Sequence, residues 1–265
     1  MTTLSDKLAK SRADGRAALI GYLPVGFPDV DASIKAMRAL VDGGADVIEV
    51  GVPYSDPVMD GPVIQKAADV AVRLGTGLDD ALRAVAAVAE AGAAAVVMSY
   101  WNPIEHYGVE RFAAALAAAG GSGAITPDLV PDEAASWLAA TDQHALDRVF
   151  LVAPSSTDAR IASTVAACRG FVYAASTMGV TGTRDQVGEA AQLLVARVRA
   201  AAPDFPVCVG LGVSNGEQAA QVARFADGVI VGSAFVRRLV DQPDAAGVSA
   251  VRELATELAD GVRRR

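Results

Sequence analysis

Two carboxylates, Glu49 and Asp60, combine residue type and position in a way that indicates acid–base chemistry. Glu49 lies within the apolar run 46–52 (DVIEVGV), which is typical of a parallel strand that is buried on both faces. A carboxylate is costly to bury unless it is paired, protonated or functional, and burial raises its pKa. We therefore expect Glu49 to be a functional carboxylate, with a structural ion pair as the alternative.

Asp60 lies in the loop 53–62 (PYSDPVMDGP), which contains two acids and three prolines and precedes a helix predicted to begin near Val63. Proline-rich turns are rigid, so this loop can hold Asp60 over the strand end that carries Glu49. An aspartate before glycine or proline also commonly caps a turn or a helix, and this is the role we favour for Asp56. For Asp60 we expect a functional carboxylate that stays ionised, because the loop is more solvated than the strand.

The remaining reactive side chains exclude several other chemistries. A Schiff-base mechanism is not expected, because the four lysines fall in predicted helices or in the N-terminal segment, at Lys7, Lys10, Lys35 and Lys66. His106, in a predicted loop after the third strand, and His144 are isolated, and neither has the spacing of a metal site. No serine lies in a GxSxG motif. Carboxylate chemistry without a metal or a cofactor is what remains.

Short apolar runs alternate with longer amphipathic segments along the chain. Runs rich in Val and Ile predict eight strands, at residues 17–23, 46–52, 94–100, 123–126, 148–153, 171–175, 207–210 and 228–231. Between them, apolar residues recur every three or four positions in segments such as 29–42 and 185–202, which predicts helices. The alternation predicts an α/β fold with a parallel sheet, and eight repeats without a linker predict a single (β/α)8 TIM barrel domain over residues 1–265.

Both ends of the chain contribute further helices to this predicted barrel. Leu4 and Leu8 lie one helical turn apart in residues 3–12, so we expect an extra N-terminal helix that covers one end of the barrel. Residues 248–262 predict a final helix. An open doubly wound sheet is the alternative fold, and it is disfavoured because no GxGxxG motif follows the first strand.

Composition narrows the classes of partner and the compartment. Lys and Arg number 23 against 31 Asp and Glu, so the formal net charge is −8 and nucleic acid is not an expected partner. We expect no membrane association, because no apolar run reaches the length of a membrane span and the N-terminus has no apolar signal region. Cys168 and Cys208 lack CxxC spacing and are expected to be reduced core residues of a cytoplasmic protein.

Three glycine-containing turns follow the last three predicted strands, at residues 179–183, 210–214 and 232–234. Late turns of α/β barrels commonly hold a phosphate group through backbone N–H groups and a helix N-terminus. Any one of the turns can equally be a plain connection, but the three together favour a small phosphate ester as the substrate. We expect the phosphate to be bound by Gly182, Gly212, Gly232 and Ser233.

Several longer motifs resemble those of one known family. Residues 48–57 (IEVGVPYSDP) with 60–65 (DGPVIQ) are similar to the signature of the tryptophan synthase alpha subunit. Further similar motifs occur at 21–29 (GYLPVGFPD), 98–103 (MSYWNP), 127–129 (PDL), 179–182 (GVTG), 210–212 (GLG) and 231–234 (VGSA). The chain departs from the family pattern at Pro24-Val25-Gly26, where Thr-Ala-Gly is common, and at the bulky Trp101.

The resemblance implies a carbon–carbon lyase of tryptophan biosynthesis, which cleaves indole-3-glycerol phosphate into indole and glyceraldehyde 3-phosphate by a retro-aldol step. In that reaction Glu49 would protonate the ring carbon and accept the hydroxyl proton of the departing chain. Asp60 would hydrogen-bond the indole N–H, and the Thr181 hydroxyl, on a lid, would meet Asp60 on closure. The indole slot would be lined by Tyr22, Tyr100, Pro127, Tyr173 and Leu211.

The resemblance also implies a partner, a pyridoxal-phosphate beta subunit that receives indole in an αββα complex. The docking surface would be the loop side of the barrel, near 53–62 and 101–107, where apolar residues are exposed. Two alternatives remain at this point: another phosphate-binding barrel enzyme, and a catalytically silent phosphate-binding protein or scaffold. Among the former, an indole-glycerol-phosphate synthase would need a barrel lysine that this chain lacks.

Overall fold

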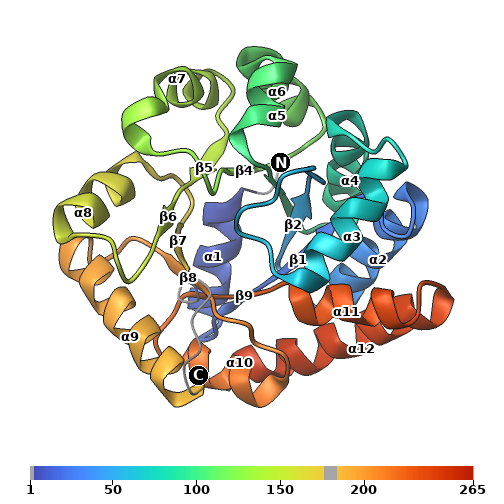
Figure 1. Cartoon of the computed structure of the whole chain (residues 1–265). Coiled ribbons are helices and arrows are strands. Elements are labelled where there is room, and N and C mark those ends of the chain that lie inside the picture. Colours follow the sequence, from blue (N-terminus) through green and yellow to red (C-terminus); the bar gives the residue numbers. More distant parts are fainter. Residues whose placement is uncertain (1–2, 176–183, 265) are drawn as a thin grey trace.

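A computed structural model of the chain describes residues 3–175 and 184–264 (Figure 1). The described residues form one parallel sheet of nine strands in the order β5-β4-β3-β2-β1-β9-β8-β7-β6. The strands are β1 (Ala18–Pro24), β2 (Val47–Gly51), β3 (Ala94–Met98), β4 (Gly123–Ile125), β5 (Asp147–Val149), β6 (Leu151–Val152), β7 (Val172–Ala175), β8 (Val207–Gly210) and β9 (Gly228–Val231). Apart from β5 and β6, consecutive strands are neighbours, as is usual for βα repeats.

The sheet closes into a barrel through a single residue, Phe150. β5 and β6 lie on either side of it, β5 pairs with β4, and β6 pairs with β7. The two short strands are thus halves of one interrupted strand, and the ring has eight strand positions. The predicted run 148–153 is therefore correct as a strand position, although the ladder is broken at its centre.

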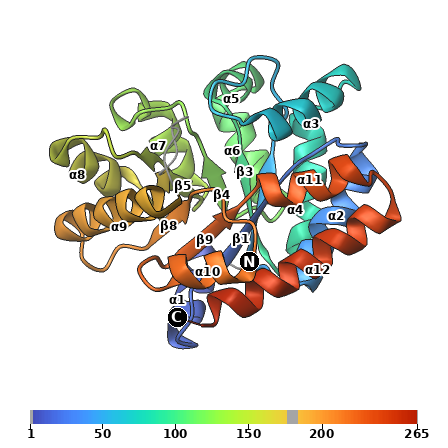
Figure 2. The ribbon, with the colours of Figure 1, turned by 60° about the horizontal axis from the view of Figure 1, so that its bottom comes forward.

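Helices surround this ring, as Figure 1 shows, and α1 appears within it. They are α1 (Leu4–Ala13), α2 (Val30–Asp42), α3 (Pro62–Arg73), α4 (Leu78–Glu90), α5 (Trp101–Tyr107), α6 (Val109–Ala118), α7 (Ala135–Gln143), α8 (Asp158–Ala167), α9 (Arg184–Ala201), α10 (Gly216–Ala223), α11 (Ser233–Asp241) and α12 (Ala245–Val262), with a 3-10 turn at Pro131–Glu133. Leu4 and Leu8 of α1 are buried against the residues that fill the barrel. The extra N-terminal helix is confirmed, and Figure 2 shows α1 at the opposite end from α5.

The period of two along each strand determines which side chains point into the barrel. The interior is filled by a closed apolar cluster from the strands, comprising Ala18, Ile20, Val47, Ala94, Val96, Ile125, Val149, Phe171, Cys208 and Ile230. On five of the strand positions, the next inward-facing residue lies two residues later in the chain; these residues are Tyr22, Glu49, Met98, Leu151 and Tyr173. These five side chains therefore form the inward-facing layer at the carboxyl end, where barrel enzymes place their sites.

Local differences from the predicted elements lie at their ends. Residues 99 and 100 leave the third strand, because Tyr100 is already the N-cap of α5. His106 lies in that helix and not in a loop, so the prediction for its segment was wrong. Asp29 caps α2 by accepting a hydrogen bond from the Ala32 N–H at 2.7 Å, which shifts the helix start by one residue. No helix in the described part of the chain is long and apolar enough to cross a membrane.

Candidate active site

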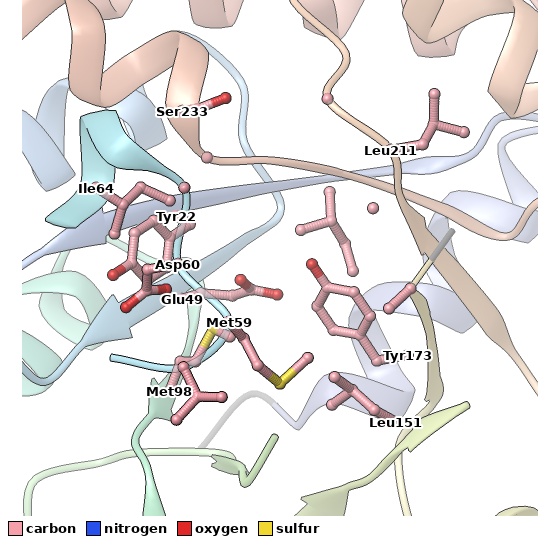
Figure 3. Close-up of a pocket in the computed structure, with 17 residues that line it drawn as sticks. Tyr22, Glu49, Met59, Asp60, Ile64, Met98, Leu151, Tyr173, Leu211 and Ser233 are labelled. Carbon is pink, nitrogen blue, oxygen red and sulfur yellow. The ribbon is translucent and has the colours of Figure 1, made fainter. Parts of the chain in front are cut away.

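A pocket of about 820 Å³ opens at the carboxyl ends of the strands (Figure 3). It combines the inward-facing layer of the barrel with the loops that follow β2, β8 and β9. It is lined by Tyr22, Glu49, Val58, Met59, Asp60, Gly61, Ile64, Met98, Leu151, Tyr173, Ala175, Gly210, Leu211, Gly212, Ile230, Gly232 and Ser233. The lining is mainly apolar with a few carboxyl and hydroxyl groups, which suits a flat aromatic ligand that carries polar substituents.

Glu49 lies at the base of this pocket on β2, opposite Tyr22 of β1 in the ladder. Its side chain is 1% exposed, and its Oε1 atom has no hydrogen-bond partner among the described residues. Burial raises the pKa of the Glu49 carboxyl to about 8, so the group is mostly protonated at neutral pH. Figure 3 shows this carboxyl group pointing into the space between Asp60 and Tyr173. Within residues 3–175 and 188–264, Glu49 has no cationic partner, so a structural ion pair is not supported.

Asp60 enters the same pocket from the loop between β2 and α3. The N-cap of α3 is Gly61, without a side-chain capping bond, so Asp60 does not cap that helix. The Tyr100 hydroxyl donates a hydrogen bond to the Asp60 carboxylate and accepts one from the Met59 N–H at 2.9 Å. Burial raises the pKa of Asp60 and the bond from Tyr100 opposes that rise. The loop is thus less solvated around Asp60 than we expected.

Glycines make room for the two tyrosines of the inward-facing layer. A Cβ atom at Gly51 would lie 2.6 Å from the Tyr22 hydroxyl oxygen, and one at Gly210 would collide with the hydroxyl of Tyr173. Both phenol groups have pKa values raised well above the usual range, primarily by burial. They are therefore neutral O–H donors at physiological pH, and their rings form walls of the pocket.

The other side of the pocket is built by the turns after β8 and β9. Gly212 has φ +77, a left-handed conformation that favours glycine, and Gly232 is the N-cap of α11. No side chain caps α11, and the N–H groups of Phe235 and Val236 donate to the Gly232 carbonyl, so the N–H groups of Ser233 and Ala234 are the ones available to a ligand. A helix N-terminus beside two glycine turns is a suitable cradle for an anion.

The structure brings together most residues that the sequence singled out. Leu211 lines the pocket. Tyr100 is not in the lining but contacts Asp60, which is, and Pro127 lies outside the lining. Thr181 and Gly182 lie outside the described residues. The sequence did not indicate a further set of lining residues, which are Val58, Met59, Gly61, Ile64, Met98, Leu151, Ala175, Gly210 and Ile230. The signal for Met98, Leu151 and Ile230 was present, because they share the period of two with the inward-facing positions of their strands.

The described residues contain no group of three or more His, Cys, Asp or Glu side chains that could hold a metal ion. His144, at the end of α7, pairs with Glu110 of α6, with 2.8 Å between Nε2 and Oε1. The lysines remain outside the pocket, in α1, α2 and α3. The chemistry available in the described lining is therefore that of two carboxyl groups and neutral hydroxyl groups.

Comparisons with known proteins cover nearly the whole chain. The family described as Tryptophan synthase alpha chain matches residues 8–263. The chain belongs to this family. The tryptophan synthase alpha chains of Thermobifida fusca and Mycobacterium marinum are 64% and 63% identical to it, over 99% and 96% of this chain and 98% and 92% of those relatives.

Solved structures similar to this alpha chain have the same fold. A structure of Mycobacterium tuberculosis tryptophan synthase is 59% identical, with a TM-score of 0.92 over 99% of each chain. The tryptophan synthase subunit alpha from Legionella pneumophila is only 30% identical, yet its TM-score is 0.90 over 100% of both chains. The predicted TIM barrel is confirmed, and the open doubly wound sheet is excluded.

Membership in the alpha-chain family also confirms the expected reaction. A tryptophan synthase alpha chain is a lyase of tryptophan biosynthesis that cleaves indole-3-glycerol phosphate. Such an alpha chain implies a beta-chain partner. The other phosphate-barrel enzymes and the silent scaffold that the sequence left open are therefore set aside.

Proposed function

We propose that Glu49 and Asp60 together carry out the cleavage of indole-3-glycerol phosphate in the pocket at the carboxyl ends of the strands. The main support is that two carboxyl groups with different surroundings face one cavity of suitable size. Glu49 lacks a hydrogen-bond partner among the described residues, whereas Asp60 accepts a hydrogen bond from Tyr100. Burial raises the pKa of both groups, but only at Asp60 does a hydrogen-bond donor oppose the rise, which favours a protonated Glu49 beside an ionised Asp60.

In this proposal Glu49 begins the reaction protonated and transfers its proton to the indole carbon that carries the glycerol chain. The ring nitrogen then bears positive charge, which the ionised Asp60 stabilises by accepting a hydrogen bond from the ring N–H. Glu49, now a carboxylate, takes the proton from the hydroxyl group on the adjacent carbon. The electrons of that O–H bond form the aldehyde, the carbon–carbon bond breaks, and its electrons restore the aromatic ring. One proton enters the ring and one leaves the hydroxyl, so Glu49 ends as it began.

Binding is assigned to the remaining groups of the pocket. The rings of Tyr22 and Tyr173, together with Leu211, would hold the flat indole group in place. Gly212, Gly232 and Ser233 would hold the phosphate, which the open N-terminal turn of α11 favours electrostatically. Gly182 and Thr181 are proposed to complete the phosphate cradle and the lid, and Tyr100 and Pro127 to support the indole slot.

Asp60→Asn tests the assignment of the second carboxylate. The amide keeps the size of the side chain but carries no negative charge, so it cannot stabilise the positive charge of the protonated ring. We expect kcat/KM for indole release to fall about 100-fold, which is typical of losing one electrostatic contact in a transition state. The matched control is Asp56→Asn, in the same loop but outside the pocket lining, which should change the rate less than threefold. Near wild-type turnover by the Asp60 variant would contradict the assignment.

We also propose that the beta partner docks on the loop side of the barrel and that the assembly is an αββα complex in the cytoplasm. Val58, in the loop that lines the mouth of the pocket, is 85% exposed, and Val130, after β4, is 39% exposed. Exposed apolar side chains near a site are the usual mark of a partner surface. The cytoplasmic location is supported by Cys168 and Cys208, which are both buried and free.

Mixing this chain with a beta chain of the family tests the assembly. We expect light scattering to give a mass equal to two chains of each kind, and indole formation by the mixture to exceed that of the alpha chain alone. Val58→Asp places a charge in the proposed apolar surface and should weaken association at least tenfold. Leu193→Asp, on exposed α9 surface remote from those loops, is the matched control. A stable complex that contains one alpha chain instead of two would overturn the proposed stoichiometry.

A further inference from the structure

Tyr22 is the one described side chain of the pocket that combines deep burial with an unused hydroxyl group beside both carboxylates. The residue is 8% exposed and lies on β1, directly opposite Glu49 in the ladder. Its ring packs over two glycines, because Cβ atoms would lie 2.6 Å from its hydroxyl at Gly51 and 3.2 Å from its Cδ1 at Gly232. The ring has little freedom to move, so its hydroxyl is held in one place.

The surroundings of that hydroxyl identify the group that it faces. Among charged groups, Asp60 has the largest electrostatic effect on Tyr22, ahead of Glu49. Figure 3 shows the Tyr22 hydroxyl directed toward the carboxylate of Asp60, while the Glu49 carboxyl points the other way, toward Tyr173. No hydrogen bond between described residues uses the Tyr22 hydroxyl. Tyr22 lines the pocket, so its hydroxyl is free to donate to an acceptor once a ligand has displaced solvent from the cavity.

We propose that Tyr22 is a positioning residue for Asp60, whose carboxylate accepts a hydrogen bond from the Tyr22 hydroxyl when substrate occupies the pocket. Asp60 would then be held between two phenol groups, Tyr22 from β1 and Tyr100 from the start of α5. Two O–H donors keep the carboxylate ionised and directed at the ring N–H, although the pocket is partly desolvated. This inference rests on the proposed function, in which an ionised Asp60 stabilises the protonated ring.

The electrostatic setting of Asp60 makes the proposal testable by pH. The groups that face it are Glu49 from β2, the hydroxyls of Tyr22, Tyr100 and Tyr173, and, beyond Tyr100, the carboxylate of Asp128. None of the described groups is a cation, so the phenols are the groups that favour the ionised form. Removing one of these phenol hydroxyls raises the pKa of Asp60. As the pH is lowered, activity that needs ionised Asp60 then begins to fall at a higher pH than in the wild type.

The test is the pH profile of kcat/KM for indole release by the full chain carrying Tyr22→Phe. This variant keeps the ring over Gly51 and Gly232 and removes only the hydroxyl. We expect the acidic limb to move up by about one pH unit, as loss of a hydrogen bond to a charged group implies, while the basic limb stays in place. Tyr100→Phe should move the same limb in the same direction. An unmoved acidic limb, or a shift of the basic limb instead, would overturn the proposal.

Two comparisons separate this inference from the proposed function. Tyr107→Phe removes a hydroxyl that donates to Asp79 at 2.7 Å outside the pocket, and should leave both limbs unchanged. Asp60→Asn should abolish the acidic limb, and full activity in that variant would refute the proposed function without reference to Tyr22. If Tyr22→Phe is too slow to assay, the ¹³C shift of the Asp60 carboxyl, assigned by its absence in Asp60→Asn, gives the same pKa with glycerol phosphate and indole bound. An unchanged pKa there would equally refute the role of Tyr22.

Discussion

Glu49→Gln is expected to lower kcat for indole release about 1000-fold, while the KM for indole-3-glycerol phosphate stays within threefold. Glutamine has nearly the same shape, but it cannot transfer a proton to the ring carbon or accept one from the departing hydroxyl. The variant therefore loses the chemical step and keeps the pocket. Steady-state indole release, measured across substrate concentrations, separates kcat from KM.

The pH dependence of the wild-type chain provides a second arm of the same test. Burial raises the pKa of Glu49 to about 8, so its acid form is lost as the pH rises through that value. Activity that begins with protonated Glu49 should decline over the same range. A basic limb far from pH 8, or one that persists in Glu49→Gln at measurable rates, would show that another group supplies the proton.

Asp147 offers a matched control for the kinetic effect. It is a buried carboxylate on β5 whose Oδ2 has no partner among the described residues, and burial raises its pKa, as for Glu49. It lies at the amino end of its strand, away from the pocket lining. Asp147→Asn should leave kcat within about twofold, because a carboxyl group at the amino end of a barrel strand is remote from the carboxyl-end site and bears on folding, not on chemistry. Equal losses in both variants would mean that Glu49 acts through the fold.

The catalytic layer of the barrel was predictable because strand geometry leaves little choice. Once Asp46 to Val52 is identified as a strand, Glu49 has to point either inward or toward the helices, and alternation puts it on the same face as Val47, which the structure places in the barrel interior. Tyr22 and Tyr173 obey the same alternation on their strands, although the sequence indicated them only through the family resemblance. The family motifs then added the roles of these residues, which no periodicity can supply.

Features that depend on loops and closure were less predictable. Tyr100 contacts Asp60 only because the loop after β2 folds back over the start of α5, a long-range packing outcome that no local pattern encodes. Pro127 falls outside the lining because β4 ends at Ile125, so the chain has left the strand before the next inward position. The interruption at Phe150 likewise arises from closing the ring, since each half of that strand pairs with a different neighbour.

Glu49→Gln is also expected to stabilise the fold, increasingly so as the pH rises. The folded chain holds the Glu49 proton up to about pH 8, whereas the unfolded chain releases it near the ordinary value of 4.5. Between these values the unfolded state binds fewer protons, so the free energy of unfolding of the wild type falls as the pH rises. Glutamine has no such dependence. Its advantage over the wild type should therefore be about 4 kcal/mol larger at pH 9 than at pH 5.

Urea denaturation of the wild type and of Glu49→Gln at pH 5 and pH 9 measures this difference. The control is Glu105→Gln, on the exposed side of α5, which should change the free energy of unfolding by less than about 0.5 kcal/mol at either pH. A gap between wild type and Glu49→Gln that does not grow with pH would mean that Glu49 is solvated or paired in the folded chain. A growing gap would show that the barrel retains a destabilising acid at the one position where the proposed reaction needs it. The same desolvation that weakens the fold keeps the proton on Glu49 at neutral pH, so stability and proton transfer oppose each other at this residue.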